Sequence, residues 1–165
     1  MSNWFGTSPT KPEGRFQATN GATDVLLAVL CLAGAPLAQT PQQIRLMVWL
    51  AGQDQTLIGR GVAGFDLCDL PWERPSFAAD RAFLLVVAAA AKTRVGWDRL
   101  GYTPPPEPLE ENLDLFAALA AALEPGDVAW DDDRSPILGW PETIRLCPRH
   151  DAYEHAHGCL LCNDV

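Results

Sequence analysis

The sequence predicts a mainly α fold, in which a helical body of about four main helices precedes a small C-terminal tail rich in cysteine and histidine. Apolar residues recur at three- and four-residue spacing in four separate segments, and Gly or Pro follows most of them. All three histidines and three of the five cysteines fall within residues 147–162. With 165 residues and 48% apolar composition, the chain is long enough to bury a single core.

The four helices are expected at about residues 21–33, 41–52, 76–94 and 109–123. Gly34 and Pro36 are stop signals after the first. The second has the clearest beginning, because Thr40 can cap it, Pro41 suits the first helical position and Gln43 stands at the capping-box position. The short link between these two helices predicts an antiparallel helical hairpin that later elements must cover.

The sequence divides the chain into four parts. They are an irregular N-terminal arm (residues 1–18), the helical body (19–125), an acidic, tryptophan-rich connection (126–142) and a metal-binding tail (143–165). Two short strands are expected, one at residues 56–58 and one at residues 143–146, where the chain enters the tail.

An apolar run at residues 25–39 is expected to be a buried helix. It is shorter than the about 20 apolar residues that span a bilayer. The 24 residues before it are not notably basic, and Asp24 adjoins its start, which is unlike a secretory signal. The sequence therefore predicts no association with a membrane.

The segment from Cys147 to Cys162 carries the strongest chemical signal in the chain. It contains C-x2-H and, after eight further residues, C-x2-C. Two ligands separated by two residues can hold one side of a tetrahedral ion through a tight turn, and two such turns complete the shell. Cys147, His150, Cys159 and Cys162 are therefore the predicted ligands of a structural zinc ion.

This pattern resembles zinc knuckles and zinc ribbons, families in which paired C-x-x-C or C-x-x-H turns hold one structural zinc. The resemblance covers only residues 143–165, and it implies a tail stapled by zinc as a short β-hairpin or knuckle. His155 and His157 are alternative ligands, because either could replace His150 or join a second, looser site. The other interpretation of this histidine pair is that both side chains are solvated.

The charge balance bears on possible partners. The chain has 21 acidic and 12 basic residues, a net charge of −9. This disfavours nucleic acid, whose phosphates require clustered Lys and Arg, and it favours attraction to a basic protein. Scarce lysine beside abundant Ala, Leu, Gly, Pro and Arg is typical of a GC-rich bacterial genome. Cys31 is expected as a buried thiol, which fits a reducing cytoplasm.

Six residues in loop-like sequence are candidates for contact with a partner, because aromatic side chains are enriched in interfaces and acidic ones attract basic surfaces. They are Trp72, Trp130, Asp131, Asp132, Asp133 and Trp140. The alternative is that these tryptophans only pack loops onto the body.

These observations favour a non-catalytic protein-interaction module with a structural zinc site, such as a bacterial immunity or antitoxin-type protein that neutralises a basic partner. The sequence has no G-x-S-x-G, P-loop, H-E-x-x-H or EF-hand pattern. Residues 59–64 fit the dinucleotide-binding pattern G-x-G-x-x-G, but the residues that follow are poor helix material, so a turning loop is expected there. The alternative is a small enzyme with an acidic site around Arg60, Asp66, Asp69 and Glu73, where paired carboxylates could transfer protons or bind a cation. A zinc-containing nucleic-acid regulator is a third alternative, which the net acidic tail disfavours.

Overall fold

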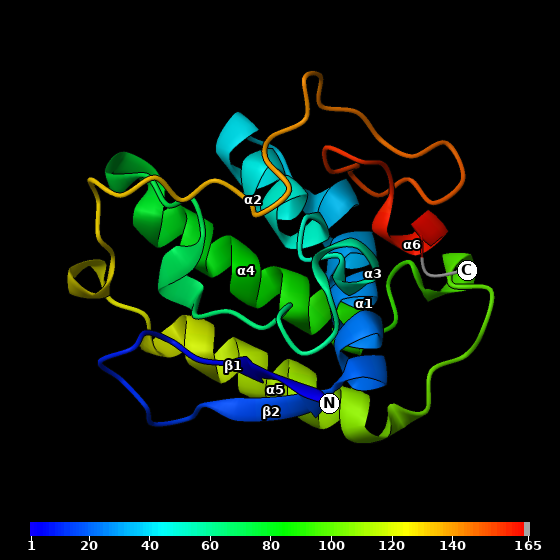
Figure 1. Ribbon diagram of the computed structural model, residues 1–165, viewed down its shortest axis with the longest axis horizontal. Helices are drawn as coiled ribbons and strands as arrows, with labels where there is room; N and C mark the ends of the chain where they lie inside the picture. Colours follow the sequence, from blue (N-terminus) through cyan, green and yellow to red (C-terminus); the bar gives the residue numbers. More distant parts are fainter. Residues whose placement is uncertain (164–165) are drawn as a thin grey trace.

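The computed structural model describes residues 1–163, and its architecture is mainly helical (Figure 1). Within these residues, the long helices are α1 (Asn20–Leu37), α2 (Pro41–Ala51), α4 (Phe77–Lys92) and α5 (Pro106–Ala122). The short elements are β1 (Ser2–Phe5), β2 (Phe16–Thr19), α3 (Gln55–Ile58) and α6 (Leu160–Asn163), with 3₁₀ turns at η1 (Leu67–Asp69), η2 (Arg74–Ser76), η3 (Trp97–Arg99) and η4 (Pro125–Asp127). All four predicted helices are present, which confirms the mainly α class in outline.

Side-chain caps begin α1 and α2. The Thr19 hydroxyl oxygen accepts a hydrogen bond from the Ala22 amide (3.2 Å), and that of Thr40 accepts from the Gln43 amide (3.1 Å). The Gln43 side chain reaches back as predicted, although its oxygen accepts from the Gln39 amide (2.8 Å), one residue before the cap. These bonds satisfy amides that the first helical turn leaves without partners.

α1 continues through Gly34 and Pro36, the two residues that we expected to lie beyond its end. Pro36 stands in the last turn, where it removes a single backbone bond, and the Ala38 amide still donates to the Gly34 carbonyl (3.0 Å). Gly34 lies where α2 approaches most closely, and a Cβ there would be 2.0 Å from Met47 Sδ. The glycine therefore serves the packing of α1 on α2 and does not stop the helix.

The N-terminal segment is a hairpin and not the irregular arm that we expected. β1 and β2 pair antiparallel, with Phe5 opposite Phe16, and the two buried rings stack at 5.1 Å between centroids. Asn3 and Phe5 face the body, whereas Trp4 is 55% exposed. The Pro and Gly residues between the strands belong to the loop of this hairpin, and the alternation in β1 was too short to be recognised.

Neither of the two strands that we expected is present as such. Residues 56–58 are helical, because the Asp54 carboxylate accepts from the amide two residues on (3.0 Å) and caps α3. The strand expected at residues 143–146 is reduced to a single bridge between Leu146 and Tyr153. The tail is therefore built mainly from turns.

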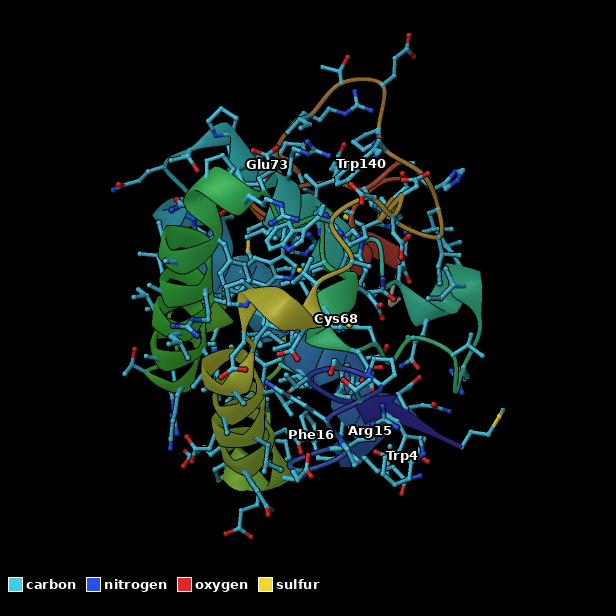
Figure 2. The ribbon with its side chains drawn as sticks, turned by 90° about the vertical axis from the view of Figure 1, so that its left-hand side faces the viewer. Trp4, Arg15, Phe16, Cys68, Glu73 and Trp140 are labelled. Carbon is cyan, nitrogen blue, oxygen red and sulfur yellow. The ribbon has the colours of Figure 1, made fainter. Side chains whose placement is uncertain are left out.

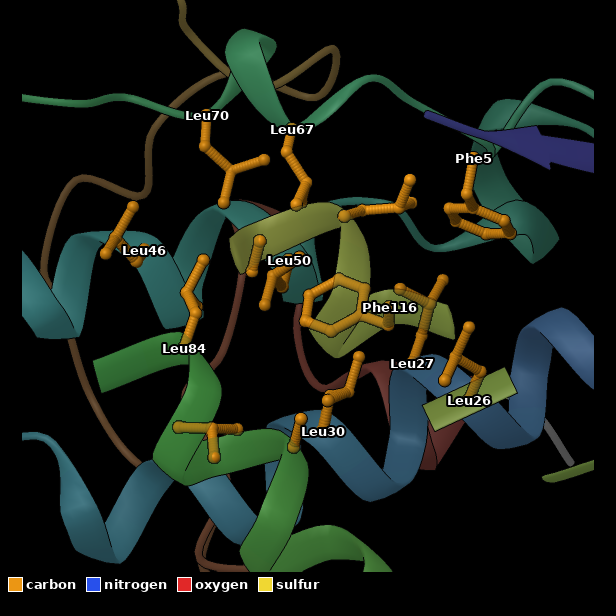
Figure 3. Packing of buried hydrophobic residues seen from close by; sticks show 14 of the residues in the cluster. Phe5, Leu26, Leu27, Leu30, Leu46, Leu50, Leu67, Leu70, Leu84 and Phe116 are labelled. Carbon is orange, nitrogen blue, oxygen red and sulfur yellow. The ribbon is translucent and has the colours of Figure 1, made fainter. Parts of the chain in front are cut away.

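α1 is the centre of the core and packs against α2, α4 and α5 (Figure 1). Figure 3 shows the side chains that interlock there. They include Leu26, Leu27 and Leu30 of α1, Leu46 and Leu50 of α2, Leu84 of α4 and Phe116 of α5, with Leu67 and Leu70 closing one side.

By length and composition alone, α1 is apolar enough to cross a membrane. However, 61% of this 18-residue helix is buried inside the protein. This burial agrees with the prediction of a buried core helix, since a helix that is apolar on all sides is typical of a protein interior.

The connection from α5 to the tail runs over the outside of the helices (Figure 1, yellow to orange). It is attached to the body near Arg134. The Trp49 indole of α2 donates to the Arg134 carbonyl (3.1 Å), and the Arg134 guanidinium donates to the Trp72 carbonyl (2.9 Å). These two bonds position the acidic residues of the connection.

Candidate functional site

The structure brings the four predicted metal ligands together. The candidate donor atoms of Cys147, His150, Cys159 and Cys162 all lie within 4.8 Å of one another. His150 Nδ1 is 3.6, 3.6 and 3.5 Å from the three sulfurs in chain order, and the sulfurs of Cys147 and Cys162 are 3.7 Å apart. A tetrahedral ion with metal–ligand distances of zinc requires separations of about 3.5–3.8 Å. Four of the six donor separations match such an ion, and the cluster can therefore hold a metal.

Two tight turns build this cluster. In the first, the Asp151 amide donates to the Cys147 carbonyl (2.8 Å), and the amides of the two residues before Asp151 donate to the Cys147 sulfur. In the second, the Cys162 amide donates to the Cys159 carbonyl (3.0 Å), while amides of residues 161 and 162 donate to the Cys159 sulfur. Gly158, with φ of 110°, lets the chain enter the second turn. The x2 spacing thus aims amides at the sulfurs and stabilises thiolates.

Burial and hydrogen bonding shift the pKa values of the four candidate ligands in different directions. Burial raises the pKa of the Cys159 thiol to about 12, and it also raises the pKa of Cys162. Burial opposes ionisation of Cys147 as well, but amide hydrogen bonds outweigh it and lower the pKa of that thiol. Burial lowers the pKa of His150, which favours the neutral imidazole that a metal requires. A metal ion must therefore displace protons from at least two sulfurs when it binds.

His155 and His157 do not join the metal ligands. His155 Nδ1 accepts from the His157 amide (3.1 Å), so the ring carries its proton on Nε2, which donates to Asp54 Oδ2 (3.1 Å). Both ring nitrogens of His155 are therefore occupied, and the exposed ring of His157 lies outside the cluster. Our alternative assignment of these residues as ligands is wrong, and His150 keeps the fourth position.

His155 instead ties the tail to the helical body. Asp54 is fully buried, and its Oδ2 also accepts from the Asn163 side chain (2.8 Å). Burial would raise the pKa of Asp54, but the hydrogen bonds from His155 and Asn163 outweigh it and lower that pKa. Apolar contacts reinforce this attachment, and they join Ala28 and Leu32 of α1 to Cys147, Ala152, Cys159 and Leu161 of the tail.

Trp72 belongs to the core and not to a partner-binding surface. It is 2% exposed, its indole donates to the Leu67 carbonyl (2.7 Å), and its ring packs on Phe77. Our prediction for this residue is therefore withdrawn. Its position between acidic residues suits an interface in the sequence, but the chain folds it inward.

The other predicted contact residues lie on or near the surface. Trp130 and Trp140 are half-buried, and each has an arginine guanidinium over its ring: Arg74 at 4.8 Å from the Trp130 centroid and Arg45 at 4.7 Å from that of Trp140. Asp131, Asp132 and Asp133 are exposed between them. Figure 2 looks onto the face that carries Trp140, with Glu73 beside it and Cys68 below.

A cavity of about 490 Å³ lies beneath the connection, and we call it the acidic cavity. Its lining from the body includes Trp49, Gln53, Phe65, Cys68 and Asp69, and its lining from η4 and the connection includes Asp127, Asp132, Asp133 and Arg134. Segments far apart in the sequence thus form one hollow with aromatic walls and several carboxylates. No local pattern marks Gln53 or Asp127 as site residues, because only the crossing of the connection brings them together.

The groups of the acidic cavity differ in how far they are engaged. Asp127 pairs with Lys11 (2.8 Å), and the Asp133 carboxylate accepts from the amide and hydroxyl of Ser135. Burial raises the pKa of Asp69. Burial, together with the charges of Asp69 and a neighbouring aspartate, raises the pKa of Cys68 to about 12. Cys68 therefore remains a thiol at neutral pH and is a poor nucleophile.

The residues of the alternative enzymatic hypothesis do not meet in one hollow. Asp66 pairs with Arg15 (3.1 Å) and Glu73 pairs with Arg45 (3.4 Å). Of the carboxylates in that hypothesis, only Asp69 lines the acidic cavity. Asp66 and Asp69 are close neighbours, since each side chain accepts a hydrogen bond from the other's backbone amide, whereas Glu73 pairs with Arg45 outside the acidic cavity.

We therefore take two candidate sites from residues 1–163, the metal-ligand cluster and the acidic cavity. The first is a closed set of four donors, and the second is an open hollow with excess negative charge. Comparisons with protein-family models, with curated proteins and with solved structures find no match to this chain.

Proposed function

We propose that this protein is a non-catalytic protein-binding module in which a structural zinc ion fixes the tail to the helices. The observation that supports this proposal is that four protein donors lie within 4.8 Å of one another, with His150 Nδ1 at 3.5–3.6 Å from all three sulfurs. Such a set leaves no coordination position for water or substrate, which is the mark of a structural site. Three sulfurs and one imidazole are a donor set that suits zinc.

Zinc in this position would connect two parts of the molecule. The ligand turns pack on α1, and His155 holds the tail to Asp54. With the tail fixed at one end and Arg134 at the other, the connection has a defined path over the body. The metal would thus maintain a surface and perform no reaction.

The partner that we propose is a basic protein. The chain carries a net charge of −9, and residues 131–133 present three consecutive exposed carboxylates beside the half-buried Trp130. Carboxylates around a partly exposed aromatic side chain suit a surface rich in Arg or Lys, which such charges also steer toward the site. The biological role that we propose for such a protein is that of an immunity protein or antitoxin in a bacterial cytoplasm.

The metal half of the proposal is tested by native mass spectrometry of the full chain. One zinc ion per chain is expected, and replacement of Cys159 by serine should abolish tight binding. A chain that stays fully folded without any bound metal would contradict a structural zinc.

The partner half is tested with two pools of short peptides of equal length, one rich in Arg and Lys and one rich in Asp and Glu. The basic pool should bind, and the triple change Asp131→Asn, Asp132→Asn, Asp133→Asn should weaken binding at least tenfold. The matched control removes three exposed charges elsewhere, through Glu13→Gln, Glu107→Gln and Glu111→Gln. Equal losses in both variants would show a bulk charge effect and count against this surface.

A further inference from the structure

We propose that the acidic cavity is a binding site for an organic cation, namely the guanidinium or ammonium end of an alkyl chain. This inference rests on the proposed function, and it names the group that the surface would receive from a basic partner. The cavity holds about 490 Å³, which lies within the range of about 300–1,000 Å³ that is usual for ligand sites.

The first observation is an amide that faces the hollow. Gln53 lines the cavity, and the residue as a whole is 2% exposed. Within residues 1–163 its side-chain amide makes no hydrogen bond and is not fully enclosed by protein. The Gln53 carbonyl oxygen is therefore an acceptor available to an N–H donor that enters the hollow.

The second observation is the charge of the lining. Four carboxylates and one guanidinium line the cavity, so with all of them ionised the lining carries 1 − 4 = −3. Lys11 neutralises part of this through its pair with Asp127. The one lining cation, Arg134, donates from its two terminal nitrogens to the backbone carbonyls of Ala129 and Trp72, while its buried Nε has no hydrogen-bond partner within residues 1–163. An excess of negative charge remains, and it attracts a cation and repels an anion.

Asp69 is the carboxylate best placed to receive such a cation. One of its oxygens accepts from the Asp66 amide (3.2 Å), and the other has only the weak Cys68 thiol donor at 3.8 Å. Burial raises its pKa, which means that its negative charge is poorly solvated. A guanidinium or ammonium group would supply the missing stabilisation through a charge-assisted hydrogen bond.

The walls explain why the cation would carry an apolar stem. Trp49 and Phe65 form a perpendicular aromatic pair with 5.1 Å between centroids, and both line the cavity together with Pro9 and Ile137. Long basic side chains bury their methylene groups against such surfaces while the charged end seeks acceptors. A bare metal ion would use none of this apolar wall. The same chemistry could come from a partner's arginine or lysine side chain or from a free small cation.

The test titrates the zinc-loaded full chain with butylguanidinium and butylammonium, using the neutral butyramide and the anion butyrate as comparators. Binding is followed by amide chemical shifts in NMR spectra. The cations should bind with a dissociation constant on the order of 1 mM, with shifts concentrated at Gln53 and Asp69. Butyramide should bind at least fivefold more weakly. Equal affinity for butyramide would overturn the proposal, since the cavity would then select only for apolar bulk.

Two variants and a matched control locate the site. Gln53→Leu removes the amide at similar volume, and Asp69→Asn removes the charge while keeping an acceptor for the Asp66 amide. Each should weaken cation binding at least fivefold, whereas Asp98→Asn, which removes the same charge at an exposed position outside the cavity lining, should change it less than twofold. Equal losses in Asp69→Asn and Asp98→Asn would overturn the proposal. If Asp69→Asn fails to fold, Gln53→Leu and the wild-type shift map decide.

A short peptide with one central arginine distinguishes the two sources of the cation. Tighter binding than butylguanidinium indicates a partner's side chain, and exclusion of the peptide indicates a free small cation. Failure here is separable from failure of the proposed function. Basic peptides that bind Gln53→Leu and Asp69→Asn as tightly as wild type, but bind Asp131→Asn more weakly, would overturn the cavity site and leave the protein-binding proposal intact, because Asp131 lies outside the cavity lining.

Discussion

Replacing Asp54 by asparagine should lower the free energy of unfolding by about 2–4 kcal/mol, although the two side chains have nearly the same shape. Asp54 is fully buried, and its two oxygens accept hydrogen bonds from His155 (3.1 Å), Asn163 (2.8 Å) and the Thr56 amide (3.0 Å). An asparagine side chain offers one acceptor oxygen and one NH₂ donor. Whichever way it turns, its NH₂ group faces another donor.

The magnitude follows from the better of the two orientations, in which the oxygen still serves His155 and Asn163. The Thr56 amide then loses its acceptor, and leaving it unsatisfied costs about 1–3 kcal/mol. The two remaining bonds change from a charged to a neutral acceptor and lose about 2 kcal/mol together. Asparagine carries no charge and therefore avoids the cost of burying a carboxylate, which offsets part of this sum. His155 cannot adapt, because a proton on Nδ1 would face the His157 amide.

Urea unfolding of the zinc-loaded protein, followed by far-UV circular dichroism, measures this loss. The control is Asp131→Asn at an exposed position, which should stay within about 0.5 kcal/mol of wild type. A double-mutant cycle with His155→Gln should give a coupling of at least about 1 kcal/mol, because the two residues share a buried bond. A loss below about 1 kcal/mol in Asp54→Asn, or additive single effects, would refute the reasoning.

The pH dependence of this effect has a definite sign. The folded protein lowers the pKa of Asp54 from its ordinary value of 3.8, so its carboxylate stabilises the fold above that pH. This stabilisation is lost as the pH falls through the lower, folded pKa. The difference in stability between wild type and Asp54→Asn should therefore shrink as the pH falls below 3.8. A difference that stays constant into that range would show that ionised Asp54 is not its source.

Three further changes test other parts of the structure. Gly64→Ala places a Cβ 2.1 Å from the Trp4 carbonyl oxygen and should destabilise the protein by at least about 2 kcal/mol. The control Gly21→Ala meets nothing within 4 Å and should be neutral or slightly stabilising. Equal melting temperatures for the two variants would refute this prediction. Cys159→Ser, or a zinc chelator, should increase hydrogen exchange of the tail amides while the helical circular dichroism signal persists. If the tail protection and the helical signal are lost together, the helical body is not separately stable. Trp49→Phe removes the indole bond to the connection, so proteolysis near residues 129–137 should accelerate. The melting temperature should also fall, because the smaller ring loses buried contacts, and unchanged proteolysis would show that this bond does not hold the connection.

Local signals determined most of the helices and the metal ligands. Thr40, Pro41 and Gln43 begin α2 as their residue types require, because a cap acts within one turn. The x2 spacings place Cys147 near His150, and Cys159 near Cys162, for the same reason. In these cases the deciding contact lies within about four residues, and the sequence predicted the outcome; the Asp54 cap of α3 is also local, but we expected a strand there.

Tertiary packing decided the rest. Gly34 looked like a helix end but accommodates Met47, and Trp72 looked like a surface residue but fills the core. His155 looked like a metal ligand in the sequence, but its Nε2 donates to Asp54, which lies about a hundred positions earlier in the chain. The acidic cavity exists only because the connection crosses α2. In each case the deciding partner is distant in sequence, and no local pattern encodes which distant surface will be complementary.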